Sequence, residues 1–232
     1  MDSRTLEKEA RKGHILILPV GALEAHGPHL PLASDVIQAE QTALALADRL
    51  DALVAPALPY GVCPGTHRFP GTVSHSVETL TQTVHELLED FYGFGFRRVL
   101  ILSGHGAGSH MTALREGAAR TLKAHPKDLK VAALCDYEFV YELRGKESPP
   151  DDGHGGLLET SRVMALAPDL VGTVRPTARY DVPPSLVGPI TDEHWGESVI
   201  GDTTRASAEL GKRIQVHVLD RLVETVERAL PP

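Results

Sequence analysis

The stretch RRVLILSG, residues 97–104, decides the fold class, because it has the pattern of a strand buried on both faces. Its valine, two leucines and isoleucine follow one another without alternating polar residues, which is typical of a strand inside a parallel sheet. A glycine-rich turn and an amphipathic segment, residues 109–125, follow directly, and we expect that segment to be a helix. Strand, turn and helix in this order indicate an α/β protein.

Short apolar runs and longer amphipathic segments alternate along the rest of the chain. Strands are also predicted at residues 14–20, 52–58 and 129–137, and helices at residues 35–50, 76–95, 157–166 and 203–230. We expect Asp35 to be the N-cap of the first of these helices, with Gln38 three residues later. The pattern predicts a parallel sheet covered by helices on both faces. Residues 168–200 are rich in proline and glycine and are not assigned.

The composition excludes several classes of protein. A net charge of −8 and an aromatic content of 5% argue against a nucleic-acid partner. The 232 residues, 42% of them hydrophobic, are enough for one large domain, and we expect residues 1–232 to form a single domain. The two cysteines, Cys63 and Cys135, form neither a disulfide framework nor a metal-binding CxxC motif. No signal segment or membrane-length apolar run is visible, so we expect a cytoplasmic protein without a membrane partner.

The stretch LPVGALEAHGPHLPLASD follows the first predicted strand and carries an unusual set of polar side chains. In locally extended backbone, Glu24 and His26 point the same way, and Asp35 returns a carboxylate at a helix start. A glutamate, a histidine and an aspartate form a mixed oxygen and nitrogen set that suits a divalent transition metal. The alternative, polar surface residues with Asp35 acting only as a cap, stays open for this loop taken alone.

Each predicted strand is followed by at least one histidine. The loops after the four strands carry, in order, Glu24, His26 and His29; then His67; then His105; and finally His154 with Glu159. Ligands of open parallel sheets bind beyond the carboxyl ends of the strands. We therefore expect these side chains to meet at one edge of the sheet.

The segment SGHGAGSH has two possible functions. Its glycines could form an anion-binding nest at a helix start, but the Walker lysine and the full dinucleotide spacing are missing. We favour the second possibility, in which Gly104 and Gly106 let the backbone bring His105 close to a buried ion. In HGGLLETS, the five-residue spacing from His154 to Glu159 excludes a HExxH metalloprotease helix. Glu159 could then bind a metal while His154 stays free for proton transfer, although a plain helix start with an exposed glutamate is the alternative.

Together these motifs resemble the creatininase (creatinine amidohydrolase) family. LPVGALEAHGPHLPLASD, THRFPGT, SGHGAGSH, HGGLLETS and GDTTRASAELGKRI are similar to five family segments in the correct order, across about residues 15–215. The resemblance implies a three-layer α/β/α sandwich with a mostly parallel central sheet. It also implies two divalent metal ions per subunit (zinc, manganese or iron), hydrolysis of C–N bonds in a small-molecule substrate, and homohexamers built from dimers.

The resemblance also assigns roles to residues. Glu24 and His26 would each bind one metal ion and Asp35 would bridge both, while His105 would join the ion of Glu24 and Glu159 the ion of His26. His154 would transfer protons, and with Glu159 it forms the expected catalytic pair. The expected substrate-binding residues are His67, Gly106, Ala107 and Trp195, the backbone N–H groups of Gly106 and Ala107 acting as donors.

The chain departs from creatininase proper at three points. Ala107 occupies the place of a glutamate ligand, Trp195 is the only tryptophan, and Ser103 stands where many relatives have asparagine. We therefore expect this chain to belong to the branch of the family in which the loop matching SGHGAGSH is rich in glycine. We do not expect an enzyme that acts on creatinine itself. The leading hypothesis is cleavage of an amide, cyclic amide or formamide by a metal-bridging hydroxide. The alternatives are hydrolysis of a ring carbonyl or C–C bond of an oxidised inositol, cleavage of a peptide precursor, or metal or anion binding without catalysis.

Overall fold

The computed structural model describes residues 1–182, 191 and 194–232. Its centre is a four-stranded sheet with the strand order β2-β1-β3-β4, in which every pair is parallel. The strands are β1 (Ile15–Val20), β2 (Leu53–Val54), β3 (Arg98–Ser103) and β4 (Lys130–Cys135). β1 is buried along its whole length and β3 from its second residue on, as their unbroken apolar sequences require. The predicted parallel sheet is confirmed.

β2 is much shorter than the predicted strand at residues 52–58. Pro56 has no N–H group and cannot donate to a strand ladder, so regular pairing stops before it. The chain nevertheless continues alongside β1, because the Ala55 and Leu58 N–H groups each donate to a β1 carbonyl at 2.9 Å. The segment therefore still ends at the carboxyl edge of the sheet.

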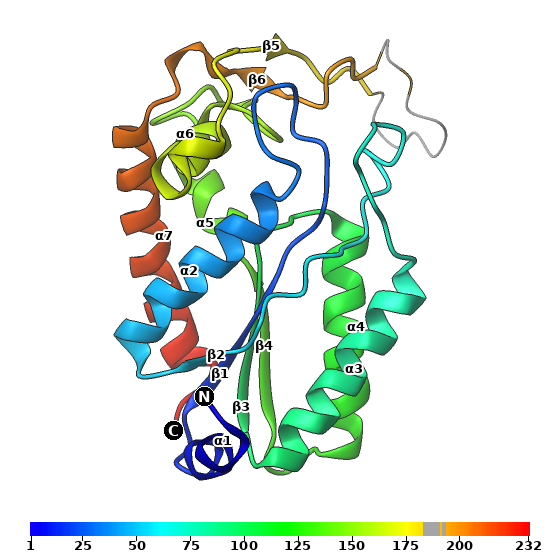
Figure 1. Cartoon of the computed structure of the whole chain (residues 1–232), viewed down its shortest axis with the longest axis vertical. Helices are drawn as coiled ribbons and strands as arrows, with labels where there is room; N and C mark the ends of the chain where they lie inside the picture. The colour runs from blue at the N-terminus through cyan, green and yellow to red at the C-terminus, as the bar shows by residue number, and fades with distance from the viewer. Residues whose placement is uncertain (183–190, 192–193) are drawn as a thin grey trace.

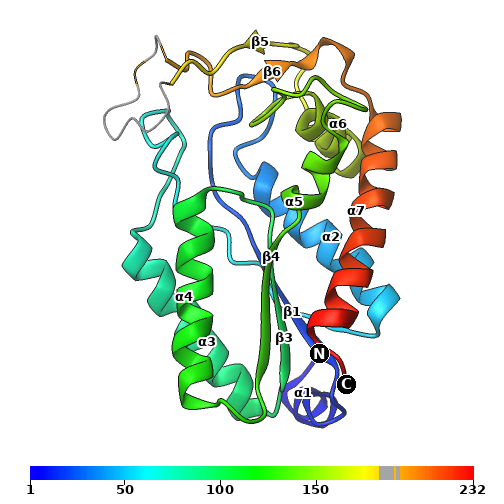
Figure 2. The ribbon, with the colours of Figure 1, turned by 180° about the vertical axis from the view of Figure 1, so that it is seen from behind.

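Helices cover both faces of the sheet, as Figures 1 and 2 show. One face carries α3 (Val77–Phe94) and α4 (Gly108–Ala124), which pack against each other. The other carries α2 (Ser34–Leu50), α6 (Leu157–Leu166) and α7 (Ala208–Ala229), with α6 packed against α7. This is the expected three-layer α/β/α arrangement. Among the described residues, no helix is both long enough and apolar enough to span a membrane.

Several elements lie outside the predicted pattern. Helix α1 (Ser3–Ala10) has Asp2 as its N-cap, whose carboxylate accepts the Arg4 and Thr5 N–H groups at 2.9 and 3.1 Å. The short elements are α5 (Tyr137–Val140), η1 (Tyr141–Leu143), η2 (Pro168–Leu170) and η3 (Thr203–Arg205), and the antiparallel pair β5 (Thr177–Ala178) and β6 (Gly201–Asp202). Helix α7 starts later than the predicted residue 203, after its N-cap Ser207. Within the unassigned stretch 168–200, residues 183–190 and 192–193 lie outside the described residues.

Two glycines bring the start of α2 against the ends of the central strands. A β-carbon at position 104 would overlap the carbonyl oxygen of Asp35, and one at position 21 would lie 2.5 Å from the Val36 nitrogen. Only glycine permits this approach of β1 and β3 to the helix. The predicted N-cap role of Asp35 is wrong, because α2 starts at Ser34 after Ala33, which makes no side-chain cap. Asp35 instead lies in the first turn, beside the carboxyl edge of the sheet.

Candidate metal centre

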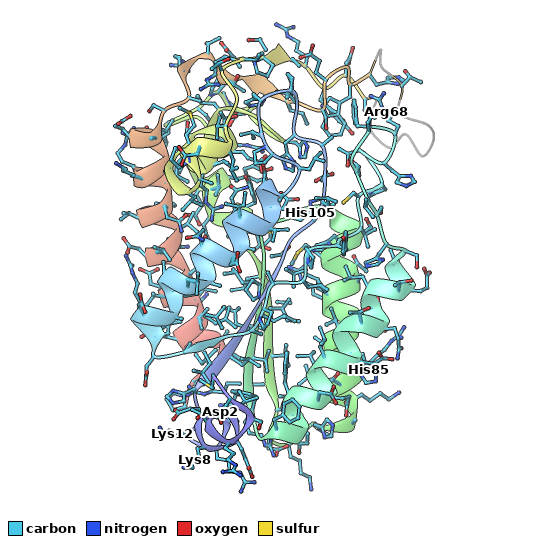
Figure 3. The ribbon with its side chains drawn as sticks, in the orientation of Figure 1. Asp2, Lys8, Lys12, Arg68, His85 and His105 are labelled. Atoms are coloured by element: carbon cyan, nitrogen blue, oxygen red, sulfur yellow. The ribbon has the colours of Figure 1, made fainter. Side chains whose placement is uncertain are left out.

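Five side chains from four segments gather at the carboxyl edge of the sheet. They are Glu24 and His26 from the loop after β1, Asp35 from α2, His105 from the loop after β3, and Glu159 from α6. Each residue is at most 5% exposed. Figure 3 shows His105 beyond the end of β3, close to the first turn of α2. The structure thus brings together the side chains that the sequence placed in separate loops.

The Asp35 carboxylate lies between two histidines. Its Oδ1 is 3.1 Å from Nε2 of His26, and its Oδ2 is 3.0 Å from Nδ1 of His105. Glu24 Oε2 lies 3.0 Å from the same nitrogen of His105, and Glu159 Oε1 lies 3.3 Å from the same nitrogen of His26. The five residues therefore form two groups of three that share Asp35.

Backbone carbonyls fix the orientation of both rings. His26 Nδ1 lies 2.9 Å from the Glu24 carbonyl oxygen, and His105 Nε2 lies 3.1 Å from that of Val62. A ring nitrogen opposite a carbonyl must carry the hydrogen, so the neutral ring directs the lone pair of its other nitrogen at the carboxylates. Metal-binding histidines usually have this arrangement, in which one nitrogen donates to a carbonyl and the other faces the ion.

The buried polar atoms of this cluster fit a pair of cations. Within the described part of the chain, Glu24 Oε2, His26 Nε2 and Asp35 Oδ2 have no hydrogen-bond partner. Buried polar atoms normally have partners, and three buried carboxylates need compensating charge. One divalent ion in each group would supply both. The donors are oxygen and imidazole nitrogen, which suit zinc, manganese or iron.

The same cluster changes the pKa values of its members. Burial opposes charge on His26 and His105, but the neighbouring carboxylates outweigh it and raise both pKa values well above the ordinary value. Burial likewise opposes charge on Glu24 and Glu159, but the adjacent histidines lower both pKa values below the ordinary one. Glu24 and Glu159 therefore stay ionised, and protons and metal ions compete for the same two histidine nitrogens.

Other polar groups hold the remaining carboxylate oxygens in place. The Gln38 amide donates to Glu159 Oε1 at 3.0 Å and accepts from the Tyr137 hydroxyl at 3.0 Å. The Gly155 N–H donates to Glu159 Oε2 at 2.7 Å, and the Thr66 hydroxyl donates to Glu24 Oε1. Sequence reasoning missed Thr66 and Tyr137 and considered Gln38 only for a cap. Gln38 could have been recognised from the sequence, because a long polar side chain on the apolar face of a helix is expected to be buried and to need a hydrogen-bond partner.

A buried serine fixes the loop that carries His105. The Ser103 hydroxyl accepts the His105 N–H at 3.1 Å and donates to the His105 carbonyl at 2.8 Å. It also lies 3.1 Å from Nε2 of His110, whose Nδ1 accepts the Val62 N–H at 3.2 Å. His110 must therefore carry its hydrogen on Nε2 and donate to Ser103. Chiefly because it is buried, its pKa falls to about 3, so the ring stays neutral.

His154 lies beside the five residues, and its Nδ1 makes no hydrogen bond with the part of the chain that the structure describes. Its Nε2 donates to the Ala25 carbonyl at 2.7 Å, and its Nδ1 lies 3.9 Å from Glu24 Oε2. The ring stacks on His26 with centroids 4.1 Å apart, and the edge of Trp195 packs against it at 5.2 Å. With 18% of its side chain exposed, His154 is the most accessible of these groups. Its Nδ1 can therefore exchange a proton with a molecule bound above the cluster.

The other predicted residues occupy different places. His29 lies outside the cluster, where its Nε2 is 2.8 Å from the Thr160 hydroxyl at the start of α6. His67 is exposed. Trp195 is buried, and its indole N–H donates to the Val199 carbonyl at 3.0 Å.

A small cavity of about 30 Å³ lies against three of the five residues, Asp35, His105 and Glu159. Its walls are made by Asp35, Gly104, His105, Gly106, Tyr137, Tyr141, His154 and Glu159. A space of this size holds a water molecule or small ions but no organic substrate. A substrate must therefore bind at the mouth, where Gly106 and Tyr141 are exposed.

Comparisons with known proteins agree with this geometry. The creatinine amidohydrolase from Pseudomonas putida is 33% identical over 239 residues, covering 94% of this chain and 90% of that one. A mycofactocin precursor peptide peptidase from Mycobacterium tuberculosis (strain ATCC 25618 / H37Rv) is 32% identical over 235 residues, covering 93% and 86%.

Solved creatininase structures superpose over nearly the whole length. A mutant described as the Zn-Zn type gives a TM-score of 0.90 at 29% identity, covering 100% of this chain and 97% of that one. A structure described as the manganese form gives a TM-score of 0.91 at 29% identity, with the same coverage. The family model for creatinine amidohydrolase matches residues 1–226. The chain therefore belongs to the creatinine amidohydrolase (creatininase) family.

Proposed function

We propose that this protein is a dinuclear metal-dependent hydrolase that cleaves a C–N bond in an amide, cyclic amide or formamide. The observation that carries the proposal is the position of Asp35, whose two carboxylate oxygens face the lone pairs of two different histidines. Glu24 completes one group and Glu159 the other. The creatininase relatives with manganese and with two zinc ions support the choice of ions.

The residues around the cluster suit hydrolysis. Bound divalent ions would supply a Lewis acid for the substrate carbonyl and a water nucleophile, since they lower the pKa of water from 15.7 to about 7. His154 would move protons through Nδ1, because its Nε2 is held by the Ala25 carbonyl. The Gly106 N–H, at the wall of the cavity, would donate to an oxyanion or to an anionic part of the substrate. Ala107 does not line the cavity, so we propose a weaker role for it.

A peptide substrate is the second candidate. It is supported by the similarity to the mycofactocin precursor peptide peptidases. Opening of an oxidised inositol ring on the same cluster is a further alternative. A protein that only binds a metal or an anion does not need a proton-transfer group such as His154 beside the bound ion. The presence of His154 therefore argues against a purely binding protein.

The test is hydrolysis of matched small formamides, lactams and dipeptides by protein stripped of metal and then reloaded with manganese or zinc. We expect metal-dependent hydrolysis of formamides or lactams. Turnover of dipeptides alone would favour the peptidase alternative, and binding of metal without turnover of any compound would contradict the proposal.

The hexameric assembly, the cytoplasmic location, the single-domain organisation and the glycine-rich branch remain predictions from the sequence. Size-exclusion chromatography with light scattering tests the hexameric assembly.

A further inference from the structure

Arg144 lies beside the mouth of the cavity on the segment after η1. Its guanidinium carbon sits 3.5 Å from the centroid of the Tyr141 ring, and Tyr141 forms part of the cavity wall. A β-carbon at Gly153 would lie 3.5 Å from Nη2 of Arg144. Since Gly153 directly precedes His154, the guanidinium lies next to two walls of the same cavity.

This guanidinium has no carboxylate partner among the described residues. Its Nε atom is buried and makes no hydrogen bond there. The charge of Arg144 favours the ionised form of Asp152, but the two make no ion pair, and the acidic side chains nearby are held by other groups. Glu142 pairs with Arg221 at 3.2 Å, Glu147 pairs with Arg213 at 2.9 Å, and Asp152 accepts two N–H groups at the start of α6.

An unpaired, half-buried guanidinium is costly to maintain unless it has a ligand. Buried charges and buried donors are normally paired, and an unpaired N–H costs about 1–3 kcal/mol. Stacking on Tyr141 holds the plane of the guanidinium, but the buried Nε–H group still makes no hydrogen bond with the described residues. The positive charge is therefore available to an anion at the mouth of the cavity.

We propose that Arg144 binds a carboxylate of the substrate, so that the substrate class is a small amide or formamide that carries a carboxylate group. The inference rests on the proposed function, because it takes the cleaved bond to lie over the Asp35 cluster. The planar guanidinium matches a carboxylate in a two-point contact. One unpaired cation compensates one negative charge, which favours a carboxylate over a phosphate dianion.

The experiment measures binding and hydrolysis separately, using the full chain loaded with manganese. Hydrolysis is measured with His154 intact, and binding is measured in proteins that also carry His154→Asn, so that turnover does not obscure the heat of binding. The ligands are N-formylglycine, N-formyl-β-alanine and N-formyl-γ-aminobutyrate, each paired with its neutral carboxamide, together with N-formylaminomethylphosphonate. The three chain lengths sample different separations between the formamide and the charge. Calorimetry gives the dissociation constants for the wild type, Arg144→Gln, Arg144→Lys and the control Lys146→Gln, which removes an exposed positive charge two residues away.

For at least one chain length, we expect the carboxylate to bind about 10- to 100-fold more tightly than its carboxamide. Arg144→Gln should abolish this preference, Arg144→Lys should keep part of it, and Lys146→Gln should leave it unchanged. Equal or undetectable binding of all pairs, or an equal loss for both members in Arg144→Gln, would overturn the proposal. Tighter binding of the phosphonate would overturn the assignment to a carboxylate. Carboxylate-selective binding without hydrolysis would count against the proposed function alone, because the binding preference would still stand.

Discussion

Replacement of Ser103 by alanine tests how the loop carrying His105 is held. The hydroxyl accepts from the His105 N–H and from His110, and it donates to the His105 carbonyl, at distances of 2.8 to 3.1 Å. Alanine leaves two donors and one acceptor unpaired in a fully buried place. At about 1 kcal/mol for each lost hydrogen bond, Ser103→Ala should lower the free energy of unfolding by about 3 kcal/mol.

The assay is urea unfolding of metal-free protein in EDTA, so that metal binding adds nothing to the stability. Ser109→Ala is the matched control, because Ser109 Oγ is also buried but has no hydrogen-bond partner among the described residues. The control should change the free energy of unfolding by less than about 0.5 kcal/mol. The reasoning is refuted if the two variants have the same stability, because the hydrogen bonds of Ser103 would then contribute nothing measurable.

Three further predictions concern the cluster and its surroundings. His154→Asn should lower kcat by about 10²- to 10⁴-fold while metal content stays at the wild-type value, and loss of metal would make His154 a ligand. Burial lowers the pKa of His29 to about 4, whereas in the unfolded chain its pKa is 6.5. The stability that the neutral, buried ring contributes is therefore fully present above pH 6.5 and is lost as the pH falls toward 4, because the unfolded chain then binds a proton that the folded chain does not. The wild type should therefore lose up to about 3 kcal/mol relative to His29→Gln over that range in urea unfolding, and parallel stability curves would contradict the assignment. Gly104→Ala should lower the melting temperature and weaken metal binding because its β-carbon overlaps a backbone carbonyl of α2, whereas Gly106→Ala, with its nearest neighbour at 3.6 Å, should do neither.

Much of the fold is predictable because periodicity and burial agree. The strands at β1, β3 and β4 are continuous apolar runs, and the long helices bury one stripe each, as α7 does with Leu210, Ile214, Val218, Leu222 and Val226. The errors have local causes. Pro56 shortens β2, and α1 was missed because its sequence is polar, although Asp2 is a recognisable N-cap.

The cluster itself was predictable because the carboxyl ends of parallel strands share one edge, so residues far apart in sequence had to meet there. The surrounding contacts were not. Whether Asp35 caps its helix or faces the histidines depends on the close packing at Gly104, which is a tertiary property. Thr66 could not be distinguished from its neighbour His67, because the sequence does not say which of two adjacent loop residues points inward.

Metal content per chain tests the central claim most directly. Protein reloaded with manganese or zinc, freed of excess ion and measured by inductively coupled plasma mass spectrometry should contain about two ions per chain. Asp35→Ala should retain almost none, because both ions lose their shared ligand, whereas Asp48→Ala, an acidic residue on the same helix outside the cluster, should retain about two. A wild type that binds one ion or none, or an Asp35→Ala variant that keeps both, would contradict the account.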